Sequence, residues 1–155
     1  MLVTASIVTY KNKKEVLDAA VTSFLNTGMD VFLYIIDNSP DDTIRQWYND
    51  SRVEYIYNNA NIGFGAAHNI IMKDISKLGK YHLVLNPDIR FEDGVLEKLY
   101  HFMEENPSIG NCMELSILMV ICSIYVSCYR LPGIGLFGCF SRLIKFGLGL
   151  ITFLK

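Results

Sequence analysis

Four short apolar segments, each separated from the next by a stretch of helical character, constrain the fold of this chain more than any other feature. The segments are largely continuous runs of apolar residues and lack a regular apolar–polar alternation. Such runs indicate strands that are covered on both faces, as in a parallel sheet. Strands are therefore predicted at Leu2–Thr9, Val31–Ile36, Val53–Tyr57 and Tyr81–Leu85.

The segments between these strands carry the spacing or the end signals of helices. Apolar residues recur every three or four positions in Lys14–Leu25 and in Glu92–Glu104. A shorter helix is predicted to begin with Ser39 as its N-cap and to end near Trp47, and another is predicted over Ala66–Leu78. The alternation of strand and helix predicts an α/β fold, in which a mostly parallel sheet carries helices on both faces.

Polar residues gather at the carboxyl end of every predicted strand. Because ligands of parallel sheets bind beyond these ends, we predict a binding site along this edge. Asp37 is placed to accept a hydrogen bond from the imide of a pyrimidine base or from a ribose hydroxyl. Its alternative role is to cap the helix that follows. The polar clusters are Thr9-Tyr10, Asp37-Asn38, Asn61 to Asn69 and Asn86 to Asp88.

One of these clusters is a glycine-rich loop between a strand and a helix. Gly63 and Gly65 allow a tight turn close to a ligand, and the amides that open the next helix favour an anion such as a phosphate. A dinucleotide fingerprint would have a third glycine where this chain has His68. A plain strand-to-helix turn is the alternative. His68 itself is predicted to be a neutral hydrogen-bonding or packing residue, because no second His or Cys lies at a ligand spacing.

The last cluster, Asn86-Pro87-Asp88, offers a carboxylate for a metal ion. Pro87 favours an extended conformation at Asn86 and so fixes the direction in which the chain leaves the strand. Magnesium is usually held by one or two carboxylates together with substrate phosphates. Asp88 is therefore a candidate ligand of a divalent cation, and its alternative role is that of a turn aspartate.

The composition changes near residue 111. Residues 1–111 contain no cysteine, whereas residues 112–155 contain all the cysteines and few charges. We therefore divide the chain into residues 1–111 and an apolar tail, 112–155. Three interpretations of the tail stay open: a membrane-associated hairpin, an unusual extension of the core, or a segment translated out of frame. The formal net charge of −2 argues against a nucleic-acid partner.

Residues 1–111 resemble the N-terminal half of a family-two glycosyltransferase with the GT-A fold. The most similar subgroup is the bacterial rhamnosyltransferase-like enzymes, which build O-antigen and other surface polysaccharides. The resemblance rests on four motifs that occur in the family's order. These motifs are Ser6-Ile7-Val8-Thr9-Tyr10, Ile36-Asp37-Asn38-Ser39, Asn61-Ile62-Gly63-Phe64-Gly65 with Asn69, and Leu85-Asn86-Pro87-Asp88.

The resemblance implies a nucleotide-sugar site along the predicted edge. It implies that Asp37 lies near the base and that Asp88 is the last acid of the family's metal motif, with Mg²⁺ or Mn²⁺ as the cofactor. The implied donor is a nucleoside-diphosphate sugar similar to dTDP-rhamnose, and the implied acceptor is a polysaccharide or a lipid-linked sugar. The expected nucleotide-sugar-binding residues are Thr9, Tyr10, Asp37, Asn38, Asn61, Gly63, Gly65, Asn69 and Asn86.

The implied reaction is inverting sugar transfer, and it requires a carboxylate that takes the acceptor's proton. In the family this base lies in an acidic segment well after the metal motif. Here Glu104-Glu105 comes too early, and Glu114 is the last acid. No catalytic residue is therefore assigned, and the fold is expected to be incomplete and the chain truncated and inactive alone.

The out-of-frame interpretation can be stated at the level of codons. Met119 to Pro132 can be encoded so that a neighbouring frame reads an Asn-Gly-Asp segment similar to one that these enzymes carry at this point. The alternative function is a small non-catalytic protein that binds a membrane or a partner through its tail. No basic and apolar leader opens the chain, so a cytoplasmic location is expected, with possible peripheral association at the inner membrane.

Overall fold

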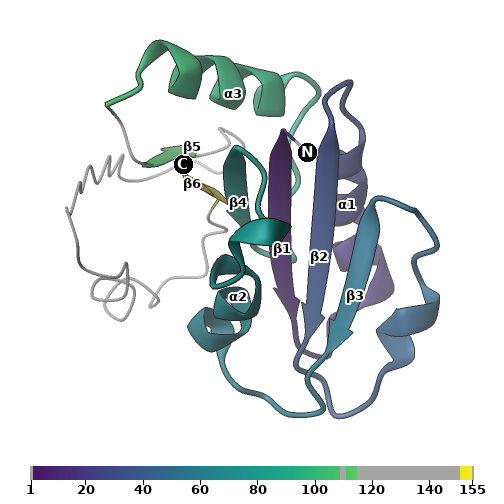
Figure 1. Cartoon of the computed structure of the whole chain (residues 1–155). Helices are drawn as coiled ribbons and strands as arrows, with labels where there is room; N and C mark the ends of the chain where they lie inside the picture. The colour runs from purple at the N-terminus through teal and green to yellow at the C-terminus, as the bar shows by residue number, and fades with distance from the viewer. Residues whose placement is uncertain (1, 109–110, 115–150, 155) are drawn as a thin grey trace, which may run out of the picture.

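A computed structural model describes residues 2–108, 111–114 and 151–154 (Figure 1). Its centre is a six-stranded sheet in the order β3-β2-β1-β4-β6-β5. The first four strands are parallel, and β6 is antiparallel to both β4 and β5. The strands are β1 (Val3–Thr9), β2 (Val31–Asp37), β3 (Val53–Tyr57), β4 (Tyr81–Leu85), β5 (Asn111–Glu114) and β6 (Ile151–Leu154). The helices are α1 (Lys14–Leu25), α2 (Phe64–Met72) and α3 (Val95–Glu105), with 3₁₀ turns η1 (Thr43–Gln46) and η2 (Ile75–Lys77).

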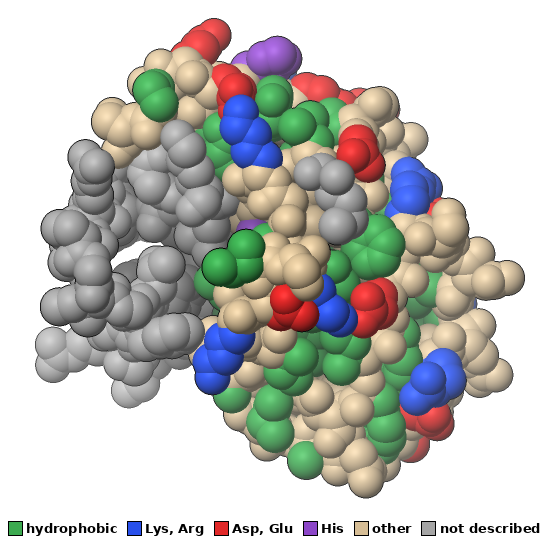
Figure 2. Space-filling view, viewed as in Figure 1, with side chains coloured by type: hydrophobic (Ala, Val, Ile, Leu, Met, Phe, Trp, Pro, Cys, Tyr) green, Lys and Arg blue, Asp and Glu red, His purple; other side chains and the backbone are tan. Residues whose placement is uncertain are grey.

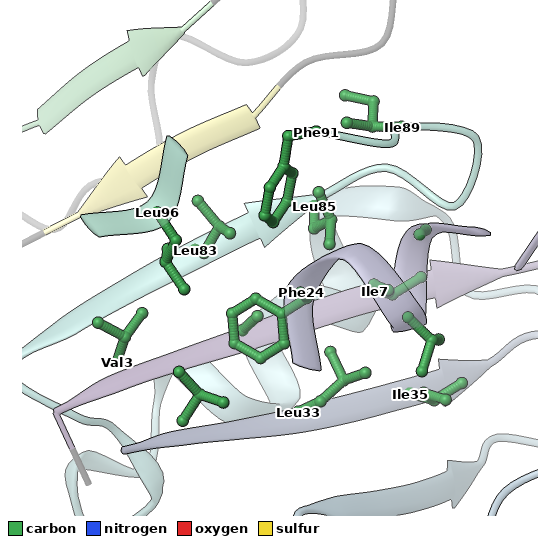
Figure 3. Packing of buried hydrophobic residues seen from close by; sticks show 14 of the residues in the cluster. Val3, Ile7, Phe24, Leu33, Ile35, Leu83, Leu85, Ile89, Phe91 and Leu96 are labelled. Carbon is green, nitrogen blue, oxygen red and sulfur yellow. The ribbon is translucent and has the colours of Figure 1, made fainter. Parts of the chain in front are cut away.

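Helices cover both faces of the sheet. Val3, Ala5 and Ile7 of β1 belong to a large core cluster together with residues of α1 and α3. Val8 belongs to a smaller cluster with residues of α2 on the opposite face. Figure 3 shows Phe24 of α1 lying over the strands of the larger cluster. The predicted α/β architecture is confirmed. Strands that are covered on both faces have no face exposed to water, which explains why their sequences are apolar throughout.

Three of the predicted helices differ from the structure, and side-chain hydrogen bonds or a glycine conformation explain each difference. The helix predicted to follow Ser39 is reduced to η1, and the Ser39 hydroxyl accepts a hydrogen bond from the Lys11 amide instead of capping a helix. Asp41 accepts hydrogen bonds from the amide and the hydroxyl of Thr43, so the helical turn opens later.

The predicted helix 66–78 is split in the same way. α2 ends at Met72, and Asp74 accepts a hydrogen bond from the Ser76 amide, which starts η2 as a separate turn. The helix predicted from Glu92 begins at Val95. It follows Gly94, whose φ of +82° is a left-handed conformation that a helix cannot include.

Most of the tail lies outside the described residues, including the apolar run 115–129 on which the membrane and out-of-frame interpretations depend. Two short strands were not predicted: β5, which spans the change in composition at residue 111, and β6 near the end of the chain.

None of the helices within the described residues is long and apolar enough to cross a membrane. On the face seen in Figure 2, acidic and basic side chains lie interspersed.

Candidate functional site

The parallel strands end together at one edge of the sheet, and this brings several predicted residues next to one another. Thr9, the last residue of β1, pairs with Asp37, the last residue of β2. Ile7 pairs with Leu85, so that Asn86–Asp88 continues beyond the same edge. The strand order reverses between β1 and β4. This is the topological switch point, where sheets of this kind bind their ligands.

Asp37 is the centre of a group of hydrogen bonds that we call the Asp37 cluster, formed by Thr9, Asp37, Ser39 and Tyr55. Its Oδ1 accepts from the Thr9 hydroxyl at 3.0 Å and from the Ser39 amide at 2.8 Å. Its Oδ2 accepts from the Tyr55 hydroxyl at 2.7 Å. The exposed fraction of Asp37 is 0%, so a ligand reaches it only if neighbouring side chains are displaced. The bond to Ser39 closes a turn and caps no helix, since the next helical residue is Thr43.

Asn38 joins the end of β2 to the glycine-rich loop. Its side chain is almost fully buried, and its Oδ1 accepts from Nδ2 of Asn58 at 2.7 Å. Its Nδ2 lies 3.5 Å from both Oδ1 of Asn61 and the carbonyl oxygen of Gly63. Asn61 Oδ1 also accepts from the Gly63 amide at 3.1 Å. Side-chain amides therefore hold the loop against the sheet without adding charge.

The two glycines of the loop differ in their backbone requirements. Gly63 has a φ of +84°, which a residue with a Cβ rarely adopts. Gly65 lies in the first turn of α2 at negative φ, and in the described part of the chain a Cβ there would meet no heavy atom within 4 Å beyond the helix's own backbone and its two neighbours. Only Gly63 is thus needed for the turn itself. Asn69 is half-buried on the second turn of α2, and the structure gives its side chain no hydrogen bond within the described part of the chain.

Asp88 is exposed just past the end of β4, and its carboxylate makes no hydrogen bond or ion pair with a described residue. Asn86 is half-buried beside it, and its carbonyl accepts from the Ile89 amide at 3.3 Å. In residues 2–108, 111–114 and 151–154, no three His, Cys, Asp or Glu side chains gather to hold a metal ion. One free carboxylate at this edge fits a cation whose remaining ligands come from a diphosphate and water.

Tyr10 stands apart from the hydrogen-bonded residues. Its side chain is 48% exposed, and the ammonium group of Lys11 lies 5.3 Å from its ring centroid. A hollow of about 220 Å³, which Tyr10 does not line, is bordered by Lys11, Ser39 and Trp47, among others. Of the predicted residues, hydrogen bonds connect Thr9 to Asp37 and connect Asn38, Asn61 and Gly63, whereas Tyr10, Gly65, Asn69, Asn86 and Asp88 lie outside these two groups.

A second polar group, which we call the histidine cluster, is formed by Thr4, Ser6, His68 and His82 within the sheet on the side of α2. Nδ1 of His82 lies 2.8 Å from the Thr4 hydroxyl, and its Nε2 lies 2.8 Å from the Ser6 hydroxyl. The Ser6 hydroxyl also lies 2.7 Å from Nδ1 of His68. Burial lowers the pKa of His68 to about 3 and that of His82 to about 4. His68 is thus neutral and hydrogen-bonded at pH 7, and its prediction is confirmed.

Several of these polar residues were not singled out from the sequence. Tyr55 was counted as a strand residue, and Asn58 was not considered. Thr4 and Ser6 alternate with apolar residues in β1, and His82 interrupts the apolar run of β4. A polar residue inside an apolar strand is a signal for a buried hydrogen-bonded group, and it could have identified the histidine cluster.

Comparisons with known proteins agree on one family and one fold. A family model described as Glycosyl transferase family 2 matches residues 6–116. S. aureus TarS 1-349 in complex with UDP-GlcNAc has a TM-score of 0.62 and 17% identity over 79% of this chain and 37% of its own. The Pyrobaculum calidifontis mannosyltransferase PcManGT in complex with GDP-Man and Mn²⁺ has a TM-score of 0.60 and 17% identity over 70% of this chain and 34% of its own.

A third structure, GalNAc-T7 with UDP, GalNAc and Mn²⁺, has a TM-score of 0.59 and 17% identity over 70% of this chain and 21% of its own. The chain thus spans roughly a third or less of each of these proteins. No curated protein sequence matches it. At these identities the solved structures establish the fold alone, and the expected GT-A-like α/β fold is confirmed.

Proposed function

The chain belongs to glycosyl transferase family 2, and from this we propose that residues 1–111 bind the nucleoside-diphosphate part of a sugar donor. The observation that carries the proposal is the pair of hydrogen-bonded groups at the carboxyl edge, one around Asp37 and one that ties Asn38 to the Gly63 loop. Structures of the same fold in complex with UDP-GlcNAc, or with GDP-Man and Mn²⁺, support it.

The Asp37 side of the edge is the proposed site of the base and the ribose. A carboxylate accepts hydrogen bonds and donates none, so Asp37 suits a base N–H or a ribose hydroxyl. The exposed ring of Tyr10 offers an apolar surface at the same edge, and aromatic rings stack well against bases. Thr9 contributes by holding the Asp37 carboxylate in place.

The other side of the edge is the proposed site of the diphosphate and the sugar. The first amides of α2 have no partner within the helix, and the helix dipole favours an anion beside them. Asn61 lies in the loop before α2, Gly65 and Asn69 lie in its first two turns, and Asn86 and Asp88 follow β4. These are the residues that we propose to contact the diphosphate and the sugar. Asp88 is the proposed ligand of Mg²⁺ or Mn²⁺. Such a cation would offset the charge on the leaving diphosphate.

The finer proposal is an inverting transferase with a dTDP-rhamnose-like donor and a surface-polysaccharide acceptor, similar to rhamnosyltransferases. Its support is the four sequence motifs, which lie along one edge of the structure. Among the described residues we assign no base that would take the proton of the acceptor. We therefore propose that this chain binds the donor and lacks transfer activity alone, and that the tail is read out of frame.

Nucleotide binding by the full chain tests this function directly. Trp47 borders the hollow beside Ser39, so its fluorescence can be followed during titration with UDP and dTDP, with and without Mg²⁺. We expect Kd values below about 1 mM that tighten with Mg²⁺. Asp88→Asn is expected to remove the effect of Mg²⁺, whereas Asp93→Asn, which changes another exposed acid after β4, is expected to keep it. Absence of saturable binding to the wild-type chain would overturn the proposal.

A further inference from the structure

Asn58 follows β3 directly and belongs neither to the four sequence motifs nor to the predicted site. Its backbone amide donates to the carbonyl oxygen of Asp37 at 2.9 Å, which extends the pairing of β3 with β2 by one residue. Its side chain is half-buried, and its Nδ2 donates to Oδ1 of Asn38 at 2.7 Å. Asn58 is therefore anchored to the end of the sheet and presents a donor to Asn38.

This donor determines which way round the side-chain amide of Asn38 lies. Such an amide has an oxygen that accepts and an NH₂ group that donates. Because Oδ1 of Asn38 accepts from Asn58, its Nδ2 faces the glycine-rich loop. There Nδ2 lies 3.5 Å from Oδ1 of Asn61 and 3.5 Å from the carbonyl oxygen of Gly63, and both of these atoms are acceptors. A reversed amide would turn an oxygen toward two other oxygens.

The two contacts of Asn38 with the loop converge on Gly63. Oδ1 of Asn61 also accepts from the Gly63 amide at 3.1 Å, and the Gly63 carbonyl accepts from the Ala67 amide at 3.1 Å as the first bond of α2. Each contact of Asn38 is longer than the usual ~2.7–3.2 Å of an N–H donor, so each is weak. Reversal of the Asn38 amide would therefore release the loop more readily than it would unfold the sheet.

We propose that Asn58 is a positioning residue: its side-chain donor fixes the orientation of the Asn38 amide and thereby holds the Gly63 loop in place. This inference rests on the proposed function, in which the loop and the first turn of α2 receive the diphosphate. The proposed site of the base and the ribose is held by other bonds, those of the Asp37 cluster. Loss of the Asn58 donor should thus weaken binding of UDP more than binding of UMP.

Two substitutions of Asn58 remove the donor in different ways. Asn58→Asp keeps the size of the side chain, but its carboxylate has no donor in either orientation at neutral pH. Two oxygens then face each other, and the Asn38 amide is expected to reverse. We expect affinity for UDP to fall about tenfold and affinity for UMP to change less than about twofold. Asn58→Ala removes the donor without adding charge, and affinity for UDP should fall about threefold.

Asn59→Asp is the matched control, because it adds the same charge at the next residue. Asn59 is exposed, and its Oδ1 accepts from the Tyr57 hydroxyl at 3.0 Å, a bond that an aspartate can also accept. Its φ of +51° is one that aspartate tolerates. We expect this variant to keep the wild-type preference for UDP over UMP within about twofold.

The experiment titrates the full chain and its variants with UDP and UMP at one Mg²⁺ concentration and follows the fluorescence of Trp47. Thermal unfolding of each preparation shows that the variant is folded. The preference for UDP over UMP isolates the loop, because partial unfolding would weaken both ligands equally. A preference that falls in both Asn58 variants and persists in Asn59→Asp supports the inference.

The other outcomes overturn one proposal or both. An unchanged preference in the Asn58 variants, or an equal loss of both ligands, overturns the role of Asn58 and leaves the proposed function intact. Equal falls in Asn58→Asp and Asn59→Asp, with Asn58→Ala unchanged, do the same, since charge alone would then explain them. A wild type that binds UDP no more tightly than UMP also overturns this inference alone. A wild type that binds neither nucleotide overturns the proposed function, and this inference falls with it.

Discussion

The Asp37 cluster and the histidine cluster are both polar groups anchored on β1, but they compensate for burial in opposite ways. The histidine cluster lies within the sheet and consists of two hydroxyls and two neutral imidazoles. The Asp37 cluster lies at the carboxyl edge and holds a carboxylate with three donors. One cluster avoids charge, and the other surrounds a charge with hydrogen bonds.

The difference follows from the cost of burying an ion. A buried imidazole can lose its proton and become neutral at pH 7, so the fold needs only neutral hydrogen bonds to hold it. A buried carboxylate needs donors that replace the water it loses, and the three donors of the Asp37 cluster supply them. The histidine cluster is thus held by neutral hydrogen bonds alone, and Nε2 of His68 has no hydrogen-bond partner within the described residues. The Asp37 cluster places its acceptors at the edge where we propose that the nucleotide binds.

The largest expected effect is acid destabilisation through the histidine cluster. The pKa values of His68 and His82 are about 3 and about 4 in the folded chain, below the ordinary value of 6.5. The unfolded chain therefore binds more protons as the pH falls below 6.5, and stability is lost from pH 6.5 down to about pH 4 through His82 and down to about pH 3 through His68. Between pH 7.5 and pH 5 the two groups together should lower the free energy of unfolding by about 4 kcal/mol.

Urea unfolding at several pH values measures this effect. His101 provides the control, since it is exposed on α3. His101→Gln should keep the full pH dependence, whereas His82→Gln should reduce it by about half while lowering stability at pH 7.5. Equal slopes for the wild type and His82→Gln between pH 5 and 7 would contradict the assignment of the titration to this cluster.

The next effect concerns the donors of the Asp37 cluster. Asp37→Ala leaves the Thr9 hydroxyl, the Ser39 amide and the Tyr55 hydroxyl without their acceptor. We expect the free energy of unfolding to fall by about 3 kcal/mol. Asp41→Ala removes an exposed carboxylate whose hydrogen bonds within the described residues go to Thr43, and it should cost about 1 kcal/mol or less. If Asp37→Ala and Asp41→Ala lowered the free energy of unfolding equally, burial of the Asp37 carboxylate would contribute nothing to stability.

The sequence predicted the edge of the sheet better than its interior. The apolar runs predicted all four parallel strands correctly. A strand that is covered on both faces has apolar residues on both faces, so a continuous apolar run in the sequence identifies it. Thr9 and Asp37 could be identified because both come directly at the end of such a run. Their partner Tyr55 could not, because an aromatic residue in a strand has the same pattern whether its hydroxyl meets water or a carboxylate.

The predictions that failed depend on which hydrogen-bond partner a polar side chain meets in the folded chain. Ser39 has the residue type of an N-cap, yet its hydroxyl meets the Lys11 amide, which is distant in sequence. Asp74 lies within an apparently helical stretch and starts a separate turn. Polar residues inside the apolar strands indicate a buried hydrogen-bonded group, but they do not show which residues meet. The contacts of Ser6 with His68 and His82 join three elements, and such partners can be identified only once the fold is known.

A smaller effect tests the loop that Asn38 holds against the sheet. Gly63 has a φ of +84°, so Gly63→Ala should lower the free energy of unfolding by about 2 kcal/mol through backbone strain alone. Because the same change displaces the loop at the proposed diphosphate site, nucleotide affinity should fall with it. Thermal unfolding and UDP titration of the same preparation measure both. Unchanged stability would mean that the loop adopts another conformation in solution.

The smallest expected effect separates stability from function most sharply. Gly65 lies in the first turn of α2 at negative φ, and outside that helix backbone a Cβ there meets no heavy atom of the described residues within 4 Å. Gly65→Ala should therefore raise the free energy of unfolding by about 0.5 kcal/mol, since alanine favours the helix. If a diphosphate lies against the amides of this turn, the added methyl group should weaken UDP binding although the fold is more stable. A variant that gains stability and keeps its UDP affinity would move the diphosphate away from α2, and the Asp37 cluster would then be the sole support for nucleotide binding at this edge.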